Sequence, residues 1–128
     1  TQEDFKGKNI VLFFYPRANT PGCTAQACNL SENYERLTKA GYSIYGVSAD
    51  QVKHQSSFSN KFGFPYPLLA DTDKTLINSF GVWGFKKFMG KEYEGILRTT
   101  FVLNKDSVIT NVIEKVKTKD HTSQILDL

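Results

Sequence analysis

The two cysteines of the chain, Cys23 and Cys28, stand five positions apart in the segment P-R-A-N-T-P-G-C-T-A-Q-A-C over 16–28. A cysteine thiolate is a strong nucleophile, and it forms most easily where neighbouring groups stabilise negative charge. A reactive sulfur with a second thiol nearby suggests a redox catalyst. The spacing is not the C-x-x-C of thioredoxin-like oxidoreductases, and no further Cys or nearby His completes a zinc site.

The residues before Cys23 predict that its sulfur lies in the first turn of a helix. Thr20-Pro21 is typical of a helix start, with Thr as the N-cap and Pro at the first helical position. Unpaired backbone N–H groups and the positive end of the helix dipole gather there, and both favour a thiolate. Cys23 also takes the place that Glu holds in a capping box, within expected reach of the Thr20 hydroxyl.

The second thiol cannot bond to the first while the helix is intact. Residues five apart in a helix have Cα atoms about 8–9 Å apart and point about 140° apart, whereas a disulfide needs a Cα separation of about 4.4–6.8 Å. A static bridge between Cys23 and Cys28 is therefore not expected. Two interpretations stay open: unrelated buried cysteines that act as small hydrophobic residues, or a pair that cycles between a helical dithiol and a locally unfolded disulfide.

The elements around this segment predict one α/β domain with a mixed sheet. The apolar runs over 9–15 and 42–48 are typical of buried strands, and a helix between them completes a βαβ unit. That helix is expected to run from Thr20 to a stop at Gly41. Further helices are expected over 50–62, 72–80 and 120–128, and further strands over 99–103 and 108–114. A short strand or extended loop is expected over 65–70, and a long loop over 81–95.

Composition limits the classes of partner. The 128 residues fit one domain, and 40% apolar residues with a net charge of +3 predict a globular fold. The scattered lysines are expected to be solvent-exposed surface residues, so no nucleic-acid partner is expected. No run approaches the roughly 18 apolar residues of a membrane span, and the polar start over 1–8 is no signal peptide, so no membrane contact is expected. Two cysteines without a leader favour a reducing compartment, and the expected location is the cytoplasm.

Other polar residues carry structural expectations. His54 and His121 are far apart in the sequence, and each is expected on the surface rather than at a metal site. Asp71 and Asp73 are expected to cap the helix that follows them, and Asp50 is expected to cap the helix over 50–62.

The segment 16–28 resembles the peroxiredoxin signature P-x-x-x-T-x-x-C, matched by Pro16, Thr20 and Cys23. Two further blocks, G-V-W-G-F-K-K-F-M-G-K-E-Y-E-G-I over 81–96 and R-T-T-F-V-L over 98–103, extend the likeness to most of the chain. Together they resemble the bacterioferritin comigratory protein, or peroxiredoxin Q, subfamily. The resemblance implies a thioredoxin-like fold, a single domain over 1–128 in which helices flank a mixed β-sheet. Relatives carry an additional N-terminal hairpin, which is expected to be missing here.

The resemblance also implies a thiol peroxidase that reduces hydrogen peroxide and organic hydroperoxides. Cys23 would be the peroxidatic cysteine, which becomes a sulfenic acid, and Cys28 the resolving cysteine, which condenses with it to an intramolecular disulfide. An external dithiol, by resemblance thioredoxin, would then reduce the disulfide. The reaction would require no metal, haem or flavin, and the protein is expected to be a monomer, as several subfamily members are.

Further site residues follow from the same resemblance. Arg98 matches the family's active-site arginine, which stabilises the thiolate and the charge on the departing oxygen. The Thr20 hydroxyl would contact both peroxide and sulfur, Pro16 would lie over the sulfur, and the backbone N–H groups of Gly22 and Cys23 would hold the peroxide oxygens. Two alternatives remain: a thiol–disulfide exchange protein without peroxidase activity, and a peroxide sensor or holdase-like module on the same fold.

Overall fold

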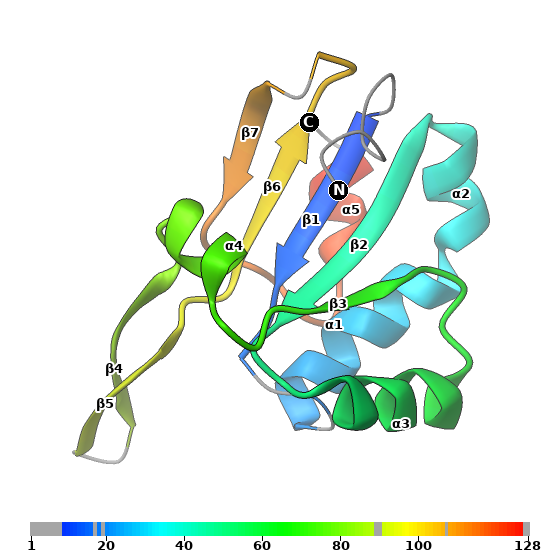
Figure 1. The fold of residues 1–128 in the computed structure, drawn as a ribbon. Coiled ribbons are helices and arrows are strands. Elements are labelled where there is room, and N and C mark those ends of the chain that lie inside the picture. Colours follow the sequence, from blue (N-terminus) through cyan, green and yellow to red (C-terminus); the bar gives the residue numbers. More distant parts are fainter. Residues whose placement is uncertain (1–8, 17, 19, 89–90, 107, 127–128) are drawn as a thin grey trace.

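A five-stranded sheet with the strand order β3-β2-β1-β6-β7 forms the centre of the molecule (Figure 1). The structure, a computed structural model, describes residues 9–16, 18, 20–88, 91–106 and 108–126, without the side chains of residues 21, 86–88 and 91–93. The strands of the central sheet are β1 (Asn9–Phe14), β2 (Tyr42–Ser48), β3 (Leu68–Ala70), β6 (Thr99–Leu103) and β7 (Ile109–Ile113). The helices are α1 (Pro21–Glu32), α2 (Tyr34–Lys39), α3 (Val52–Phe62), α4 (Thr75–Ser79) and α5 (His121–Leu126).

The sheet is mixed, as the sequence predicts. β1, β2 and β3 run parallel, whereas β6 is antiparallel to β1 and β7 is antiparallel to β6. Phe14 at the end of β1 pairs with Val47 of β2 and with Thr99 at the start of β6. One edge of the sheet therefore brings together the loop after β1, the residues that follow β2 and the residue that precedes β6.

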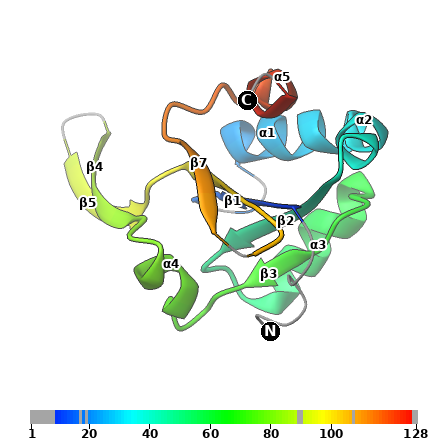
Figure 2. The ribbon, with the colours of Figure 1, turned by 90° about the horizontal axis from the view of Figure 1, so that it is seen from above.

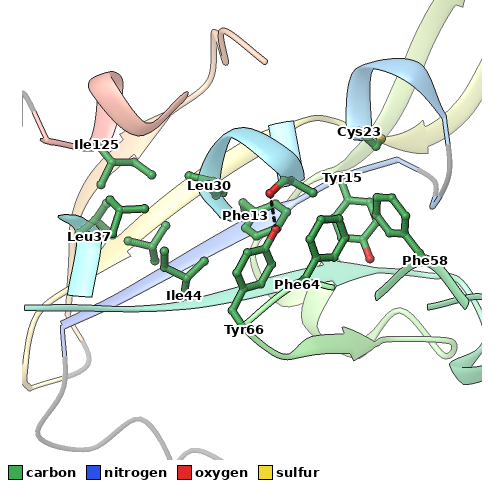
Figure 3. Close-up of a cluster of buried hydrophobic side chains, with 13 residues drawn as sticks. Phe13, Tyr15, Cys23, Leu30, Leu37, Ile44, Phe58, Phe64, Tyr66 and Ile125 are labelled. Atoms are coloured by element: carbon green, nitrogen blue, oxygen red, sulfur yellow. Dashed lines mark hydrogen bonds between the residues drawn. The ribbon is translucent and has the colours of Figure 1, made fainter. Parts of the chain in front are cut away.

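β1 is buried on both faces, which explains its continuous apolar run. Val11 and Phe13 belong to a core cluster on the face that α1, α2 and α5 cover (Figure 2). Phe58 of α3 joins the same cluster (Figure 3). Leu12 and Phe14 belong to a second cluster on the other face, which includes Ile77 of α4. The predicted arrangement of a sheet flanked by helices is confirmed.

The helix expected to continue to Gly41 is divided at Asn33. The Asn33 side-chain amide donates to the Asn29 carbonyl at 2.9 Å, the oxygen that its own backbone N–H reaches at 3.3 Å. Such a local side-chain bond competes with regular helix geometry. α2 ends at Lys39, two residues before Gly41, which has a φ of +92°. At 12 residues α1 is the longest of these helices. Within the described ranges none has the length and apolar character needed to cross a bilayer.

The prediction of a long loop over 81–95 is wrong. β4 (Trp83–Phe88) and β5 (Lys91–Ile96) pair antiparallel as a separate two-stranded ribbon, which extends away from the body of the molecule in Figure 1. Its backbone hydrogen bonds form between the two strands. Phe85 in β4 is 75% exposed. The usual alternation of apolar and polar residues is therefore absent, and the sequence pattern carries no strand signal.

His121 is buried, and the prediction of a surface position for it is wrong. Its Nδ1 lies 2.8 Å from Oε1 of Gln124, and its Nε2 lies 2.7 Å from the Thr100 hydroxyl on β6. The backbone N–H of Lys117 also donates to Gln124 Oε1, so this oxygen is an acceptor and His121 Nδ1 carries the proton. The second histidine, His54, is exposed as predicted.

We expect the stability of the fold to fall as the pH drops below 6.5 because of His121. Burial lowers the pKa of His121 below the ordinary value of 6.5. The unfolded chain therefore binds the proton first, and the stabilisation present above pH 6.5 is lost as the pH falls towards the folded-state pKa. Denaturant unfolding from about pH 7.5 to about pH 5.5 measures this loss. His121→Asn should flatten the pH dependence, whereas the matched change His54→Asn should leave it intact. Equal slopes in all three proteins would contradict the assignment.

Candidate active site

Cys23 lies in the first turn of α1, as the sequence predicts. Thr20 is the N-cap residue by its extended backbone, with φ −86° and ψ 154°, and Pro21 begins the helix. The Thr20 carbonyl accepts from the backbone N–H of Thr24 at 2.8 Å, while its side chain makes no capping hydrogen bond. Only 1% of the Cys23 side chain is exposed. The sulfur is therefore shielded from bulk water at the positive end of a helix dipole.

Arg98 contacts the sulfur directly. Its Nη2 donates to Cys23 Sγ at 3.3 Å, and its Nη1 donates to Gln26 Oε1 at 2.6 Å. Arg98 is far from Cys23 in the sequence, but it immediately precedes β6, whose first residues pair with the end of β1. A guanidinium is always protonated and presents its donors in a fixed plane, so it stabilises negative charge on the sulfur.

Gly22 lets the guanidinium approach the helix start. A Cβ atom at position 22 would lie 3.1 Å from Arg98 Nη2, closer than an ordinary van der Waals contact. A larger residue would therefore push the guanidinium away from Cys23. Sequence reasoning selected Gly22 for its backbone N–H group, and the structure adds a second reason, the space that its missing side chain leaves.

Gln26 is a site residue that sequence reasoning missed. It lies three positions after Cys23, hence on the same helix face, and its side chain is fully buried. Its Oε1 accepts from Arg98, whereas its Nε2 has no hydrogen-bond partner among the described residues. A buried amide costs free energy unless it is bonded, so the bond to Arg98 compensates for part of this burial and fixes the orientation of the guanidinium. The i+3 spacing from a reactive cysteine was the available signal.

Cys28 lies further along the same unbroken helix, and both cysteines are free thiols. Burial, followed by the nearby Glu32 carboxylate, raises the pKa of the Cys28 thiol. Next to it, the Ala27 carbonyl accepts from the Tyr66 hydroxyl at 2.7 Å, a bond drawn as a dashed line in Figure 3. The structure is thus the helical dithiol, in which the two sulfurs cannot meet.

Pro16 and Ala18 belong to the loop between β1 and α1, of which residues 17 and 19 lie outside the described residues. Pro16 is partly buried. The backbone N–H of Ala18 donates to Asp50 Oδ2 at 2.8 Å. The expectation that Asp50 caps α3 is therefore wrong, since the N-cap of α3 is Gln51. Because the ends of the parallel strands β1 and β2 share one edge of the sheet, Asp50 reaches the loop instead of the helix.

Asp71 and Asp73, which the sequence predicts as caps of α4, accept hydrogen bonds from backbone N–H groups at its start, although the N-cap residue of α4 is Lys74. Asp71 Oδ2 accepts from the N–H of Ile77 at 2.8 Å, and Asp73 Oδ1 accepts from that of Thr75 at 3.2 Å. Both carboxylates thus accept hydrogen bonds from backbone N–H groups. Nowhere in the described ranges do three or more His, Cys, Asp or Glu side chains form a group that could hold a metal ion.

An open groove lies near the site but does not include the sulfur. Its lining includes Phe80, Leu97 and Phe101, together with Arg98. Phe80 and Phe101 belong to the second core cluster, on the face of the sheet opposite α1. Cys23 does not line this groove, so we assign the reacting centre by the Arg98–Cys23 contact rather than by the groove.

Sequence comparison places the chain among known proteins. A family model, the AhpC/TSA family, matches residues 1–112. The chain belongs to this family. Peroxiredoxin Bcp of Escherichia coli (strain K12) is 43% identical to this peroxiredoxin over 124 residues, which make up 97% of the chain and 80% of the relative. A putative peroxiredoxin bcp of Coxiella burnetii is 42% identical, with 97% and 82% covered.

Solved structures agree with these relatives. The bacterioferritin comigratory protein of Xanthomonas campestris, studied for its alkyl peroxide reduction activity, matches the peroxiredoxin with a TM-score of 0.92 and 35% identity, covering 99% of this chain and 80% of that chain. A mutant PrxQ of Xylella fastidiosa matches with a TM-score of 0.92 and 31% identity, covering 99% and 79%. The predicted thioredoxin-like fold and subfamily resemblance are confirmed. The peroxiredoxin is a thiol peroxidase. The alternative of a thiol–disulfide exchange protein without peroxidase activity is therefore not retained.

Proposed function

We propose that this peroxiredoxin reduces hydrogen peroxide and organic hydroperoxides, with Cys23 as the peroxidatic cysteine. The observation that supports this most is the 3.3 Å contact between Arg98 Nη2 and a buried sulfur in the first turn of α1. In the reaction, an electron pair of the Cys23 thiolate attacks one peroxide oxygen and forms the S–O bond. The O–O bond breaks, and the departing oxygen takes up a proton to leave as water or an alcohol.

The other site residues act on the charge and position of the peroxide. Arg98 stabilises the resting thiolate and the negative charge on the departing oxygen. The backbone N–H groups of Gly22 and Cys23 lie in the first turn of the helix, where N–H groups have no intrahelical partner, and they bind the peroxide oxygens. The Thr20 hydroxyl orients the peroxide, and Pro16 limits the access of water to the sulfur.

Cys28 is the resolving cysteine in this proposal. Its thiol gives up its proton and attacks the sulfenic sulfur of Cys23, the S–S bond forms, and the S–O bond breaks, with the departing hydroxide taking up a proton to leave as water. A dithiol reductant, which we propose to be thioredoxin, then restores both thiols by exchange. Because the disulfide cannot form within an intact helix, α1 must open between the two cysteines in each cycle.

Contacts around Asn29, the residue after Cys28, oppose that opening. Asn29 Oδ1 accepts from the backbone N–H of Thr122 at 2.7 Å, and its Nδ2 donates to the Lys119 carbonyl at 3.0 Å. The Thr122 hydroxyl donates to the Asn29 carbonyl at 3.2 Å. These bonds join the Cys28 end of α1 to α5 and to the segment before it. We infer that they limit the rate of disulfide formation.

Asn29→Ala is expected to accelerate disulfide formation by about three- to tenfold. Losing two side-chain hydrogen bonds, each worth about 1 kcal/mol, favours helix opening, while the better helix propensity of Ala offsets part of this effect. Pre-reduced protein mixed with one equivalent of hydrogen peroxide, then quenched and assayed for free thiols, gives the rate. The exposed Asn78 provides the control Asn78→Ala. A disulfide rate equal to the wild type would contradict the inference, as would a changed rate of the first, peroxide-dependent step.

The same experiment on the wild type tests the proposed function. One equivalent of hydrogen peroxide should consume both thiols and produce a disulfide between Cys23 and Cys28 within one chain. A protein that keeps both thiols after exposure to peroxide would contradict the proposal. Full turnover with reduced thioredoxin, and no turnover without a dithiol, would identify the class of reductant.

We propose that the protein acts as a monomer in the cytoplasm, as one domain. Cys23, Arg98 and Gln26 come from one chain, which supports a site that needs no second copy. The two thiols must return to the reduced state in every cycle, and a reducing compartment provides that condition. Sedimentation analysis of the reduced and the oxidised protein would test the monomeric state.

A further inference from the structure

We propose that Asp50 is a positioning residue for peroxide reduction. Through the backbone N–H of Ala18, its carboxylate holds the loop that carries Pro16 and leads to Thr20 and Cys23. This inference rests on the proposed roles of those residues. The Asp50 carboxylate does not touch the substrate but determines the position of the loop.

The contact connects two distant parts of the chain. Asp50 Oδ2 accepts from the Ala18 N–H at 2.8 Å, and the two residues are 32 positions apart. The bond is partly buried, and Ala18 also lies against the first core cluster. A charged acceptor on a backbone N–H is among the stronger hydrogen bonds. The middle of the loop is therefore fixed to the segment that follows β2.

The Asp50 carboxylate is itself held in place by a hydrogen bond from the end of β2. The Ser48 hydroxyl donates to the same Asp50 oxygen at 2.7 Å, and Ser48 is fully buried at the end of β2. The side-chain amide of Gln55 on α3 donates to the Ser48 hydroxyl at 2.9 Å and to the Leu69 carbonyl on β3 at 2.7 Å. Two strands and a helix thus determine where Asp50 lies, and through it where Ala18 lies.

The position of this loop matters because it carries Pro16 and leads to Thr20, two residues of the proposed site. The guanidinium contacts the sulfur from the start of β6, whereas Pro16 and Thr20 would act on the peroxide from the loop. A peroxide must lie between these groups with its O–O bond in line with the sulfur. A displacement of about 1 Å in such a site can lower the rate by about a hundredfold. Asp50 therefore acts on peroxide alignment rather than on the sulfur itself.

A purely structural role as a helix cap does not fit the contacts. The N-cap of α3 is Gln51, which has an extended backbone, and no side chain caps this helix. Asp71 offers the comparison within the same chain, because its buried carboxylate also accepts a backbone N–H at 2.8 Å, from Ile77 of α4, away from the loop. Asp71 is thus a matched control for the loss of a carboxylate–amide bond.

The test compares two reactions of the same sulfur in a Cys28→Ser background. Oxidation by hydrogen peroxide requires substrate alignment, whereas alkylation by iodoacetamide reports the reactivity and accessibility of the Cys23 thiolate. Asp50→Ala should slow oxidation by about tenfold or more while alkylation changes by less than about twofold. Asp50→Asn keeps an oxygen that accepts both bonds, so it should recover most of the oxidation rate. Asp71→Ala should leave the ratio of the two rates unchanged even if it lowers the melting temperature.

Three outcomes would overturn the proposal: an oxidation rate for Asp50→Ala within about twofold of the parent, an equal fall in both reactions, or an Asp50→Asn variant as slow as Asp50→Ala. If Asp50→Ala does not fold, Ser48→Ala removes the hydroxyl that donates to the carboxylate. It should then slow oxidation selectively, by about two- to fivefold. Failure of the proposed function would look different, because the parent protein would be alkylated at Cys23 yet would not be oxidised by peroxide.

Discussion

Cys23→Ser is expected to reduce peroxide consumption to below about one-thousandth of the wild-type rate, a loss of at least about 4 kcal/mol of transition-state stabilisation. A serine hydroxyl at the start of α1 is far less ionised and less nucleophilic than a thiolate in the same place, even with Arg98 in contact. Stopped-flow measurement of peroxide reduction by the pre-reduced protein gives this rate.

Cys28→Ser is the matched control, since it removes the other thiol of the same helix. It should leave the first oxidation of Cys23 within about twofold of the wild type, because Cys28 is remote from the sulfur that attacks. It should also stop turnover after one cycle and leave a sulfenic acid that dimedone traps. Equal loss of the first step in both variants would contradict the separate roles of the two cysteines.

Arg98→Ala is expected to slow peroxide reduction by at least about tenfold. Removal of a donor that stabilises an oxyanion typically slows a reaction by about 10²–10³-fold. The variant removes the donor 3.3 Å from the sulfur, and it also leaves the buried Gln26 side chain without its bond to Nη1. Arg98→Lys keeps the charge but cannot contact both groups in one plane, so it should recover only part of the rate.

Arg36→Ala is the control for the arginine prediction, because Arg36 is exposed on α2, away from the sulfur. Its variant should match the wild type in the same stopped-flow assay. A wild-type rate in Arg98→Ala would remove this arginine from the reaction, despite its contact in the folded dithiol. A slow Arg36→Ala would point instead to an effect of net charge on the encounter with substrate.

Both predictions concern one redox state of the chain, and the opening of α1 connects that state to the next. The contacts at Asn29 favour the closed dithiol, and the raised pKa of Cys28 disfavours the thiolate that would attack. In the proposed cycle, a sulfenic acid at Cys23 therefore waits until the helix opens. A sulfenic acid held in this way is exposed to a second peroxide, which would take it to the irreversible sulfinic acid. The stability of one helix thus affects both turnover and inactivation.

Local signals in the sequence determined the reactive end of α1. Thr20 and Pro21 start the helix, and Cys23 follows three positions after the cap, because capping depends on residues within one turn of one another. The same kind of signal located Gly41, which has a positive φ just after the end of α2. The continuous apolar run of β1 likewise predicted a strand covered on both faces.

Contacts between distant segments had no such signal, and the tertiary structure alone decided them. The pairing of β1 with β2 and β6 brings Asp50 to Ala18 in the loop before α1 and Arg98 to Cys23, although each looks like an ordinary surface residue in its own segment. The burial of His121 follows from the docking of α5. A residue's neighbours in the chain fix its backbone conformation, whereas its charge partners and its exposure depend on which strands lie next to one another.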